Sequence, residues 1–472
     1  MRRFVPPYSN LCQMEPLWKD FQYQDHQESG IAWMMEREED EIPGGILCDE
    51  MGLGKTIQVL GLMKNKPMRA TLLIAPLATL AQWEEKAVAA GFRVKRPARS
   101  FDLWESVNLH QSDAICLYIA NYEKLIYRPS LLLKESWDRV VFDEAHRLRN
   151  KNRGYEMAAT IECGIRWFLT ATPIVNEVAD VARLFEIMGH VKVPKTLLEL
   201  RPLIGLKVIA RKMDDIRETV GDLPPAAIIE EHKLDFTTEE EAEFYRGIQG
   251  SIMSKWRALE ADGNLSAQHR FQLITRLRQI SIHPQVYISA RKRFYKGYTR
   301  PNWETPSTKF THLAHLMKSE SEESHRWMVF CHFHEEMELL KAHLTSLSFI
   351  RRVQIYSGEV AESMRTKIIE DSKQPLGEKQ HEVLLIQLQA GGVGLNLQHF
   401  DRVCFMGPWW TAALMDQAIG RAVRIGQKNQ VYVHRIFLKE EETDEITNID
   451  DFMMEKAEMK RDLCESFLEL AA

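Results

Sequence analysis

The sequence predicts an α/β protein of two parallel-sheet lobes, with helical protrusions between and upon them. Two stretches of the 472-residue chain alternate short apolar runs with helical patterns, and a helix-rich stretch lies between them. Short, uninterrupted apolar strands separated by helices are typical of parallel sheets that are covered on both faces. The chain is also long enough for two or three domains, each with an ample core.

The strands of both lobes are predicted from these apolar runs. In the first lobe, the expected strands are Ile46–Cys48, Thr71–Ala75, Ala114–Ile119, Val140–Phe142 and Trp167–Thr170. In the second lobe, they are Met328–Phe330, Val353–Tyr356, Val383–Ile386, Val403–Met406 and Tyr432–Ile436. The carboxyl ends of such strands meet at one edge of the sheet, where ligands bind in folds of this class.

Between the lobes, from about residue 182 to residue 310, the helical pattern dominates. Leu223-Pro224-Pro225 is typical of a rigid connector. Phe236-Thr237-Thr238, followed by three glutamates, predicts a capped helix start. The last thirty residues, rich in Glu, Lys and Met, predict a terminal helix. The expected domains are residues 1–222 (first lobe, with a helical protrusion at about 178–222), 223–310 (linker and helical protrusion of the second lobe), 311–440 (second lobe) and 441–472 (a C-terminal helical brace).

The overall charge does not by itself indicate nucleic-acid binding. The formal net charge is -6 and the isoelectric point is about 6.3, whereas nucleic-acid-binding domains are often strongly basic. An acidic protein can still bind a polyanion in a local basic groove. Two basic runs, Lys95–Arg99 and Arg291–Arg300, are candidates for such a groove, and an ordinary solvated surface is the alternative for each.

The seven cysteines indicate a reducing compartment. They are scattered, odd in number and never spaced as C-x-x-C, so neither a disulfide framework nor a zinc module is expected. Cys331, His332 and His334 lie close together, but they have no second ligand pair nearby, and we do not expect a metal site there. No apolar stretch approaches the roughly 18 residues of a membrane span, and the N-terminus does not resemble a secretory signal. A cytosolic, nuclear or similar reducing location is predicted.

The sharpest local signal is a glycine-containing loop between a strand and a helix, at residues 46–56. Gly52 and Gly54 allow a tight turn whose backbone N–H groups can face a phosphate, and the helix N-terminus adds partial positive charge. Lys55 can reach the β and γ phosphates of a nucleotide, and the Thr56 hydroxyl can ligate Mg²⁺. The expected nucleotide-binding residues of the loop are Asp49, which replaces the first Gly of the common pattern, with Glu50, Met51, Gly52, Leu53, Gly54, Lys55 and Thr56.

A second signal is a strand that ends in two acids, Asp143 and Glu144. Asp143 can hold Mg²⁺, and Glu144 can orient and deprotonate an attacking water, as phosphoryl transfer requires. From Lys55 to Asp143 the chain advances 88 residues, which suits three intervening β-α units of roughly 30 residues each. The loop and the acid pair therefore supply complementary parts of one predicted site.

Ordered motifs along the first lobe resemble those of the Swi/Snf-type ATPases within helicase superfamily 2. Residues 49–56 (DEMGLGKT) and 143–146 (DEAH) resemble motifs I and II of that family. Residues 26–33 resemble its upstream glutamine motif, which implies that Gln27 contacts the adenine. Residues 73–77 with Gln82-Trp83 resemble motif Ia, residues 121–123 motif Ic, and residues 169–176 motif III.

The resemblance continues through the second lobe and covers about residues 20 to 465. Leu277-Arg278-Gln279 with His283-Pro284 is similar to the family's protrusion signature, and residues 329–330, 356–358 and 408–410 resemble motif IV and two further short elements. Residues 389–397 resemble motif V, in which Gly394 is expected to contact the nucleotide. Residues 416–427 resemble motif VI, with Arg421 and Arg424 as arginine fingers. Three residues apart, the two would share a face if they lay on a helix.

The resemblance implies two RecA-like lobes that hydrolyse ATP with Mg²⁺. The implied catalytic residues are Lys55, Asp143, Glu144, Arg421 and Arg424, with Thr56 and Asp143 as metal ligands. Double-stranded DNA is the implied track, gripped through its phosphates without sequence preference, and motifs Ia, Ic, IV and V are the candidate contacts. Trp83, Trp409 and Trp410 are candidates for stacking on bases, although burial in the core is the favoured interpretation.

Several departures from the family pattern leave the catalytic groups in place. Ala171 and Val175 replace the usual Gly and Gln of motif III, and residues 209–212 (IARK) replace a paired-arginine segment. Ile419-Gly420 precedes the first finger in place of the usual residues. The chain resembles a bare motor core of the compact viral or microbial kind, so a targeting partner protein is expected.

Three functions remain in competition at this point. The first is a DNA translocase that remodels nucleosomes or other DNA-bound complexes, in the nucleus or in a viral or microbial compartment. The second is a strand-separating DNA or RNA helicase, against which the protrusion signature and residues 425–427 argue. The third is a non-catalytic scaffold, which the presence of Lys55, Glu144 and Arg421 opposes.

Overall fold

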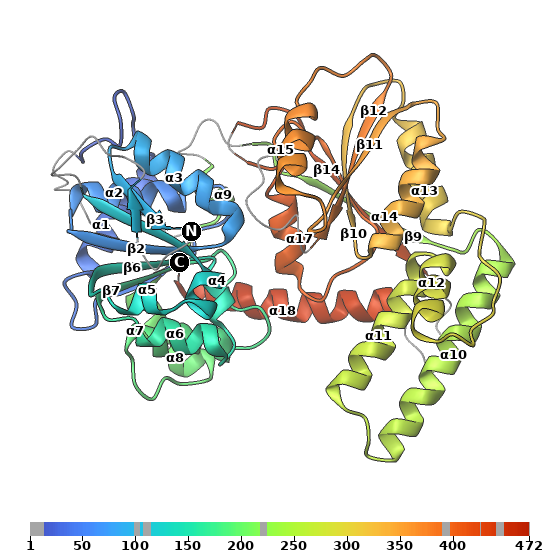
Figure 1. Ribbon diagram of the computed structural model, residues 1–472, viewed down its shortest axis with the longest axis horizontal. Coiled ribbons are helices and arrows are strands. Elements are labelled where there is room, and N and C mark those ends of the chain that lie inside the picture. Colours follow the sequence, from blue (N-terminus) through green and yellow to red (C-terminus); the bar gives the residue numbers. More distant parts are fainter. Residues whose placement is uncertain are drawn as a thin grey trace. The chain divides into compact units, whose positions relative to one another are not determined.

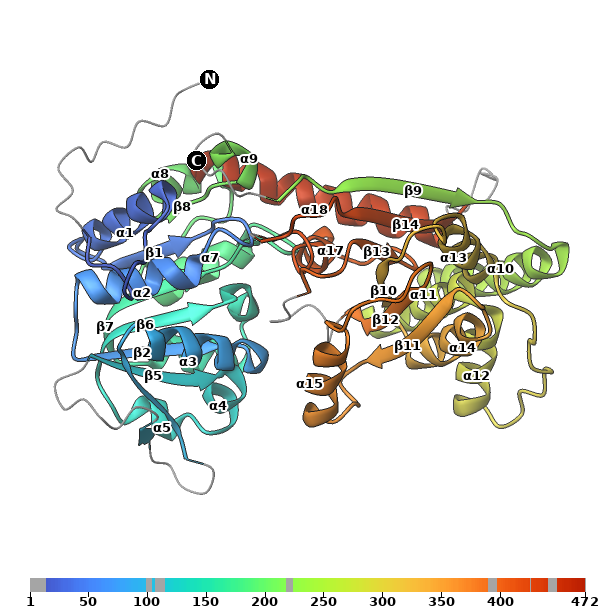
Figure 2. The same ribbon diagram turned by 90° about the horizontal axis from the view of Figure 1, so that it is seen from above.

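The computed structural model describes residues 14–98, 104–106, 115–217, 224–388, 397–424, 426–439 and 448–471. The chain divides into two compact units, one formed by Met1–Leu223 with Met459–Ala472 and the other by Pro224–Glu458. Each unit is built on its own sheet, and several strands of each are labelled in Figure 1 and seen from above in Figure 2. The prediction of an α/β fold with two mostly parallel sheets is confirmed.

The sheet of the first unit has eight described strands in the order β4-β3-β5-β2-β6-β7-β1-β8. All neighbours are parallel except β3 and β4. Five strands coincide with the predicted apolar runs: β1 (Gly44–Leu47), β2 (Ala70–Ala75), β5 (Cys116–Asn121), β6 (Trp137–Asp143) and β7 (Cys163–Leu169). Three strands were not predicted: β3 (Arg93–Pro97), β4 (Trp104–Ser106) and β8 (Val208–Ile209).

Strand β3 explains part of the first basic run. It pairs with β5 and β4 at the edge of the sheet, and of its side chains that of Val94 is fully buried. Lys95 donates to the Tyr118 hydroxyl at 3.0 Å, and Arg96 pairs with Glu84 at 3.3 Å. The described part of this run therefore makes contacts within the protein, while Arg99 lies outside the described residues.

Helices cover both faces of the first sheet, because alternate strand residues point to opposite faces. Leu72 and Ile74 of β2 belong to one core cluster, whereas Leu73 and Ala75 belong to the other. The second of these cores includes residues of α1 (Asp25–Arg37), α2 (Lys55–Asn65) and α3 (Leu80–Ala89). The first includes residues of α4 (Tyr122–Tyr127), α5 (Ser130–Leu133), α6 (Arg153–Thr160), α7 (Ala179–Met188) and α8 (Leu197–Lys207), and a short helix α9 (Met213–Ile216) follows β8.

The second unit has a six-stranded, fully parallel sheet in the order β11-β12-β10-β13-β14-β9. The five predicted strands appear as β10 (Arg326–Cys331), β11 (Ile350–Tyr356), β12 (His381–Gln387), β13 (Arg402–Phe405) and β14 (Tyr432–Leu438). The edge strand β9 (Ile228–Leu234) was not predicted, because its sequence IIEEHKL is largely polar and its side chains are mostly exposed. The two faces of the six-stranded sheet are covered by helices. Helices α13 (Thr308–Ser319) and α14 (His334–Thr345) lie on one face, and α15 (Glu362–Asp371) and α17 (Ala412–Ile419) lie on the other.

A helical protrusion is inserted between β9 and α13, as the helical pattern predicted. It consists of α10 (Glu239–Ala261), α11 (Ala267–Ile282) and α12 (Pro284–Phe294). Thr238 caps α10 by accepting from the backbone N–H of Glu241, which confirms the predicted helix start. The predicted terminal helix is α18 (Ile449–Ala471), whose first half belongs to the second unit and whose last part belongs to the first.

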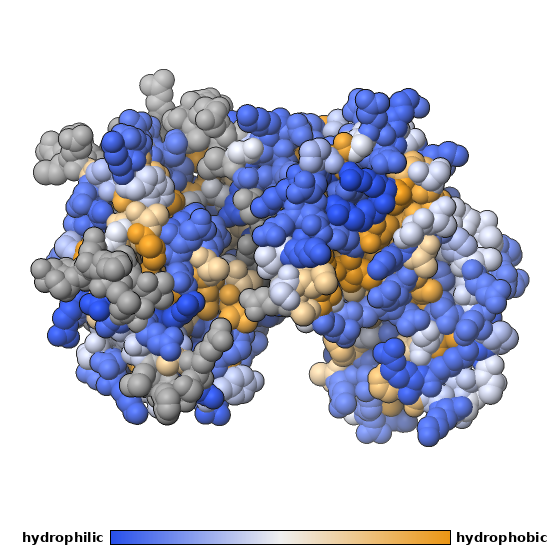
Figure 3. All heavy atoms as spheres, turned by 45° about the horizontal axis from the view of Figure 1, so that its top comes forward, coloured by the Kyte–Doolittle hydropathy of each residue, from blue (hydrophilic) through white to orange (hydrophobic). Residues whose placement is uncertain are grey.

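Hydrophilic residues cover most of the face drawn in Figure 3, since most large apolar side chains lie in the cores. Among the described helices, none is both long and apolar enough to cross a membrane. Six cysteines lie in the described ranges, and each of them is a free thiol.

A buried ion pair fixes α1 against the first sheet. The side chains of Glu38 and Arg139 are both 0% exposed, and they form two hydrogen bonds of 2.6 and 2.7 Å. The Trp167 indole N–H also donates to Glu38, at 2.9 Å. Removing one partner of such a pair leaves an uncompensated charge in the core, which is far more costly than losing an exposed pair.

We therefore expect Glu38→Ala to lower the free energy of unfolding by about 3–5 kcal/mol. The matched control is Glu39→Ala, because the side chain of Glu39 is 75% exposed in its pair with Lys66, and we expect a change within about 0.5 kcal/mol. Urea unfolding followed by tryptophan fluorescence measures both. Equal effects of the two substitutions would contradict the structural role assigned to the Glu38–Arg139 pair.

Candidate functional site

The glycine-containing loop follows β1 and leads directly into α2. Gly52 and Gly54 have φ angles of 94° and 82°, a region that favours glycine. Space also demands glycine, since a Cβ on Gly54 would lie 2.5 Å from the Gln27 amide nitrogen and one on Gly52 2.5 Å from the end of Met213. The helix begins at Lys55, as predicted. The loop thus turns its backbone sharply at the N-terminus of a helix, where N–H groups are free to bind an anion.

The loop is held from behind by the guanidinium of Arg211. This group donates to both carboxylate oxygens of Asp49, at 2.8 and 2.5 Å, and to the Gln58 side-chain oxygen at 2.8 Å. Gln58 in turn donates to Asp49 at 2.8 Å, and the Asp49 side chain is fully buried. Arg211 also donates to the His26 carbonyl and the Ser29 hydroxyl. The Asp49 carboxylate is therefore committed to shaping the loop, and only its backbone remains for a ligand.

Segment 208–216 supports the same loop through its backbone. The N–H groups of Cys48 and Glu50 donate to the carbonyls of Ile209 and Arg211, at 2.8 and 2.9 Å. The Glu50 carboxylate accepts from the Met213 N–H at 2.6 Å, and burial raises the pKa of that carboxyl. Leu53 is buried against Met213 and Ile216. Glu50 and Leu53 thus anchor the loop with their side chains.

Gln27 lies over the loop, next to Gly54. Its amide nitrogen donates to the Leu53 carbonyl at 3.4 Å, and its oxygen accepts from the Gln24 N–H at 3.2 Å. The neighbouring His26 ring contacts the same Leu53 carbonyl at 2.9 Å, and burial lowers the pKa of that ring. A neutral His26 with its proton on Nε2 is the form that can donate this bond.

Lys55 points back into the hollow of its own loop. Its ammonium donates to the Asp49 carbonyl at 2.6 Å and to the Glu50 carbonyl at 3.4 Å. Thr56 lies in the first turn of α2, partly buried, and Met51 is partly exposed within the loop. The ammonium therefore lies within the turn that the sequence predicts to bind phosphate.

The two acids lie at the carboxyl end of β6. Asp143 accepts from the Trp83 indole at 2.9 Å and from the Glu144 N–H at 3.0 Å, and the Tyr122 hydroxyl donates to its carbonyl at 2.8 Å. Burial, followed by repulsion from Glu144, raises the pKa of Asp143 to about 6, while the positive charge of Lys55 opposes that rise. Glu144 itself has a left-handed backbone with φ of 51°. Trp83 is 2% exposed, so its interpretation as a buried core residue is correct.

His146 connects the acid pair to the segment after β7. Its Nδ1 lies 3.4 Å from the Glu144 carboxylate and 3.2 Å from the Thr170 hydroxyl, which accepts from the Thr172 N–H at 3.1 Å. Burial lowers the pKa of His146 to about 3, so its ring is neutral. The sequence placed these residues in motifs II and III, but nothing in it indicated that one imidazole joins them.

These residues fit MgATP. Backbone N–H groups of the loop and the Lys55 ammonium suit phosphate oxygens, and the Thr56 hydroxyl and the Asp143 carboxylate are the hard oxygen ligands that Mg²⁺ prefers. When bound, Mg²⁺ neutralises the charge that develops on the phosphates. The glycine turn that a Cβ would fill is the structural observation that favours this ligand.

The expectation that Arg421 and Arg424 share a helix face is wrong. Helix α17 ends at Ile419, and Gly420 is its C-cap, so Arg421 and Arg424 lie in the turns that follow and do not share a helix face. The Arg421 side chain is buried, and burial lowers the pKa of Arg424. The segment is fixed by the buried Gln427 amide, which donates to the carbonyls of Gln398 and Phe400 at 2.7 and 3.1 Å. Gly394, the other predicted nucleotide contact of this unit, lies outside the described residues.

A cation–aromatic cluster joins three motifs of the second unit. Arg278 of the protrusion bonds His332 Nδ1 at 2.7 Å and lies 4.6 Å from the centre of the Trp409 ring. His332 and Trp409 stack with centroids 5.2 Å apart, and Trp410 lies 5.9 Å from Arg278. Trp409 is 8% exposed, so it too is a core residue. His332 has its partner in Arg278, and Cys331 is buried in the core.

A glycine turn at the start of a helix, a strand-end acid pair and two mostly parallel sheets are the features of two-lobed nucleotide hydrolases. Residues 26–286 match the SNF2-related domain family, and residues 308–426 match the helicase conserved C-terminal domain. The chain belongs to the SNF2-related family: it is a Swi/Snf-type motor of helicase superfamily 2 and a DNA-dependent ATP hydrolase.

The chain is also similar to individual proteins and to solved structures. The chain is 28% identical to the "Probable global transactivator" of Orgyia pseudotsugata multicapsid polyhedrosis virus over 88% of this chain and 86% of that protein. It is 26% identical to the ISWI chromatin-remodeling complex ATPase ISW1 of Saccharomyces cerevisiae over 94% of this chain, although this covers only 40% of the yeast protein. Among solved structures, the Sulfolobus solfataricus SWI2/SNF2 ATPase core in complex with dsDNA is 21% identical with a TM-score of 0.41, over 98% of this chain and 99% of that one.

The Arg211 network can be tested without touching a ligand-binding group. Arg211→Lys keeps the charge but loses the two-pronged bond to Asp49, so we expect the loop to loosen and ATP affinity to fall at least about tenfold. Arg217→Lys is the matched control, because the Arg217 side chain is 39% exposed in its pair with Asp214. Fluorescent-nucleotide titration measures both, and unchanged affinity in folded Arg211→Lys would refute the supporting role.

The raised pKa of Asp143 predicts a pH dependence. As the pH falls from 8 through about 6, the carboxyl gains its proton and can no longer hold Mg²⁺, so Mg²⁺-dependent ATP binding should weaken about fivefold between pH 6 and pH 5. An ordinary Asp would keep its charge throughout this range. His146 stays neutral there and does not contribute. ATP titrations at fixed free Mg²⁺ should show this fall in affinity with pH in the native protein. If Asp143→Asn shows the same fall, another group is responsible for it.

Proposed function

We propose that this chain is an ATP-dependent double-stranded DNA translocase of the Swi/Snf type. The observation that carries the proposal is the supported phosphate loop beside the Asp143–Glu144 pair, within a chain whose family match extends across both units. A site whose loop, metal ligands and water-orienting acid are all present supports an active hydrolase over a non-catalytic scaffold.

Each site residue is assigned a role in hydrolysis. Gln27 reads the adenine, and Lys55 with the loop N–H groups holds the phosphates. Thr56 and Asp143 ligate Mg²⁺. Glu144 orients the attacking water and accepts its proton, and His146 positions the Glu144 carboxylate from 3.4 Å away. Arg421 and Arg424 would act as arginine fingers and Gly394 would contact the nucleotide. Arginine fingers contribute about 10³–10⁵ in rate in related chemistry.

His146 also offers a route from hydrolysis to movement. It contacts both Glu144 and Thr170, and Thr170 accepts from the backbone of Thr172. A change in Glu144 as the γ-phosphate leaves would therefore reach the segment after β7 through one neutral ring. We propose that this contact couples the state of the nucleotide to the DNA-binding segments of the first unit.

The track is proposed to be duplex DNA bound through its phosphates, and the target a nucleosome or another DNA-bound complex. Relatives include a chromatin-remodeling ATPase and a viral protein described as a transactivator. We place the protein in the nucleus, or in a viral or microbial compartment that holds DNA, with a partner protein that selects the target. Phosphate contacts carry no sequence information, so target choice must come from elsewhere.

The first test is the steady-state ATP hydrolysis rate of the protein alone and with double-stranded DNA, single-stranded DNA or RNA, each at two salt concentrations. We expect strong stimulation by duplex DNA that falls at the higher salt, because counterion release drives phosphate binding. Lys55→Ala should abolish hydrolysis in every condition. Preferential stimulation by RNA or single strands would favour the strand-separating helicase, and hydrolysis that Lys55→Ala leaves intact would place the activity elsewhere.

A further inference from the structure

Three potential metal ligands lie on one face of the second sheet, at its β9 edge. Glu230 of β9 is the direct neighbour of His434 of β14 in the parallel register. His232 follows Glu230 by two residues, so it lies on the same face of the strand. The strand pairing therefore brings together side chains that are about 200 residues apart in the sequence.

The ligand atoms of these side chains converge at metal-site distances. His232 Nε2 lies 3.2 Å from His434 Nδ1, which lies 3.3 Å from a Glu230 carboxylate oxygen, and that oxygen lies 3.9 Å from His232 Nε2. Zinc–nitrogen and zinc–oxygen bonds of about 2.0–2.2 Å in a tetrahedron separate neighbouring ligand atoms by about 3.3–3.6 Å. The three observed distances lie near this range before any ion is added.

The protonation states of the two rings also suit a metal. Burial lowers the pKa of His434 to about 3 and also lowers the pKa of His232, so both rings are neutral near pH 7. His434 Nδ1 has two close neighbours, one imidazole nitrogen and one carboxylate oxygen. A single proton on His434 Nδ1 can satisfy the His232 nitrogen and the Glu230 oxygen only if both share it. A divalent cation can instead accept a lone pair from each of the three ligand atoms.

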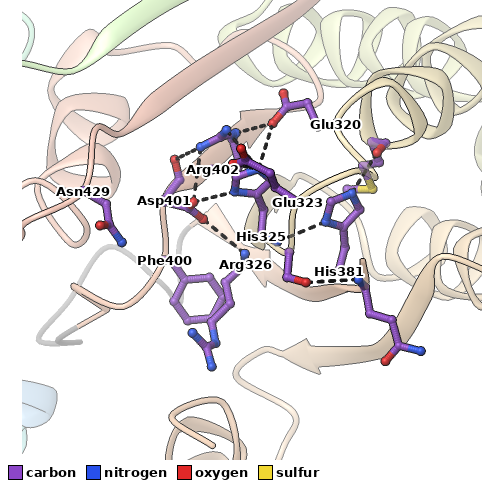
Figure 4. Close-up of polar contacts among 12 residues, drawn as sticks. Glu320, Glu323, His325, Arg326, His381, Phe400, Asp401, Arg402 and Asn429 are labelled. Carbon is purple, nitrogen blue, oxygen red and sulfur yellow. Dashed lines mark hydrogen bonds and ion pairs between the residues drawn. The ribbon is translucent and has the colours of Figure 1, made fainter. Parts of the chain in front are cut away.

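The opposite nitrogen of His434 faces a carboxylate. Its Nε2 is buried without a hydrogen-bond partner in the described structure and lies 3.9 Å from Glu320. Figure 4 shows Glu320 directed toward Arg402 and His325, and its other oxygen accepts from Arg402 at 2.5 Å. Metal-bound histidines characteristically turn their second nitrogen toward a carboxylate, and Glu320 lies on that side of His434, at a distance too long for a hydrogen bond.

The three proposed ligands range from a buried side chain to a half-exposed one. The side chains of His434, His232 and Glu230 are 1%, 19% and 45% exposed, in that order. Trp327 stacks on His434 with centroids 5.4 Å apart, and the His312 ring of α13 lies 4.9 Å from that of His232. The group is thus rigid at its base and open at Glu230, where an ion can enter.

We propose that Glu230, His232 and His434 form a zinc site, with a fourth position open to water. Two imidazoles and one carboxylate are a ligand set for Zn²⁺ or a similar late divalent ion, whereas Mg²⁺ prefers oxygen ligands and several waters. This site is separate from the MgATP site, which belongs to the first unit. The bound ion would cross-link β9, the first strand of the second unit, to β14 and so secure the outermost strand of the sheet.

The test uses the untagged, full-length protein, stripped with a chelator and held in millimolar Mg²⁺ without nucleotide. Zn²⁺ is titrated in competition with a chromophoric chelator, and Co²⁺ is substituted to record its visible absorption. We expect one equivalent of Zn²⁺ per chain and the intense visible bands of four-coordinate Co²⁺. His232→Ala should weaken Zn²⁺ binding at least about tenfold and remove those bands.

Two further variants keep the result interpretable. Glu230→Gln changes a half-exposed side chain on an edge strand, so it tests the site even if His232→Ala fails to fold, and the same loss of affinity is expected. His269→Ala removes a partly exposed histidine of α11 whose ring contacts the Asn264 carbonyl, and binding should be unchanged. No bound equivalent, or equal weakening in His269→Ala and His232→Ala, would overturn the proposal while leaving the ATP hydrolysis assay unaffected.

Discussion

The phosphate loop depends on one buried interaction, the two-pronged bond between Arg211 and Asp49. A loop that must present bare N–H groups to an anion cannot be stabilised from its ligand side, so its stability has to come from behind. Arg211 supplies this with one guanidinium that reaches Asp49, Gln58, Ser29 and the His26 carbonyl. The same side chain thereby links the loop to α1, α2 and the segment after β8. Burial of both partners makes the bond strong only while every donor and acceptor is satisfied.

The support behind the loop also bears on its two glycines. Gly52 and Gly54 hold positive φ angles, and Gln27 and Met213 occupy the space where their side chains would be. Gln27 reaches this place because α1 is fixed by Glu38 and Arg139, and Met213 because α9 follows Arg211 in the chain. Elements from both ends of the first unit thus enclose a loop of a few residues. Preorganisation of this kind leaves little reorganisation for the moment when a nucleotide binds.

Much of this arrangement could be predicted from the sequence, and the omissions have physical reasons. Ten strands were predicted because each carries an uninterrupted apolar run, which is what a covered parallel strand requires. Strand β9 was missed because it is an edge strand with mostly exposed side chains, where polar residues are tolerated, and β3, next to the edge, because its sequence RVKRP is largely polar. Strands β4 and β8 were missed because they are only three and two residues long. The predicted loop and acid pair occupy their expected places at the ends of β1 and β6.

Residue roles that depend on distant contacts could not be predicted in the same way. Asp49 was expected at the nucleotide, but its carboxylate is bound by a residue 162 positions away. Arg421 and Arg424 were expected on a helix face, yet Gly420 ends α17 before them. The Glu230–His232–His434 group carries no local motif, because a strand pairing between the two ends of the second unit creates it. Spacing within a motif is local information, whereas register between strands is not.

The position of β1 in its sheet has a consequence for synthesis of the chain. The strand that leads into the phosphate loop pairs on one side with β7 and on the other with β8, so neither neighbour exists until the ribosome has added more than a hundred further residues. Long-range parallel pairing of this kind forms slowly and late. The nascent protein therefore carries its nucleotide-binding sequence for most of the translation of the first unit without a nucleotide-binding site. The loop can gain its full support only after β8, at Val208–Ile209, has been made, when little of the segment Met1–Leu223 is left to translate.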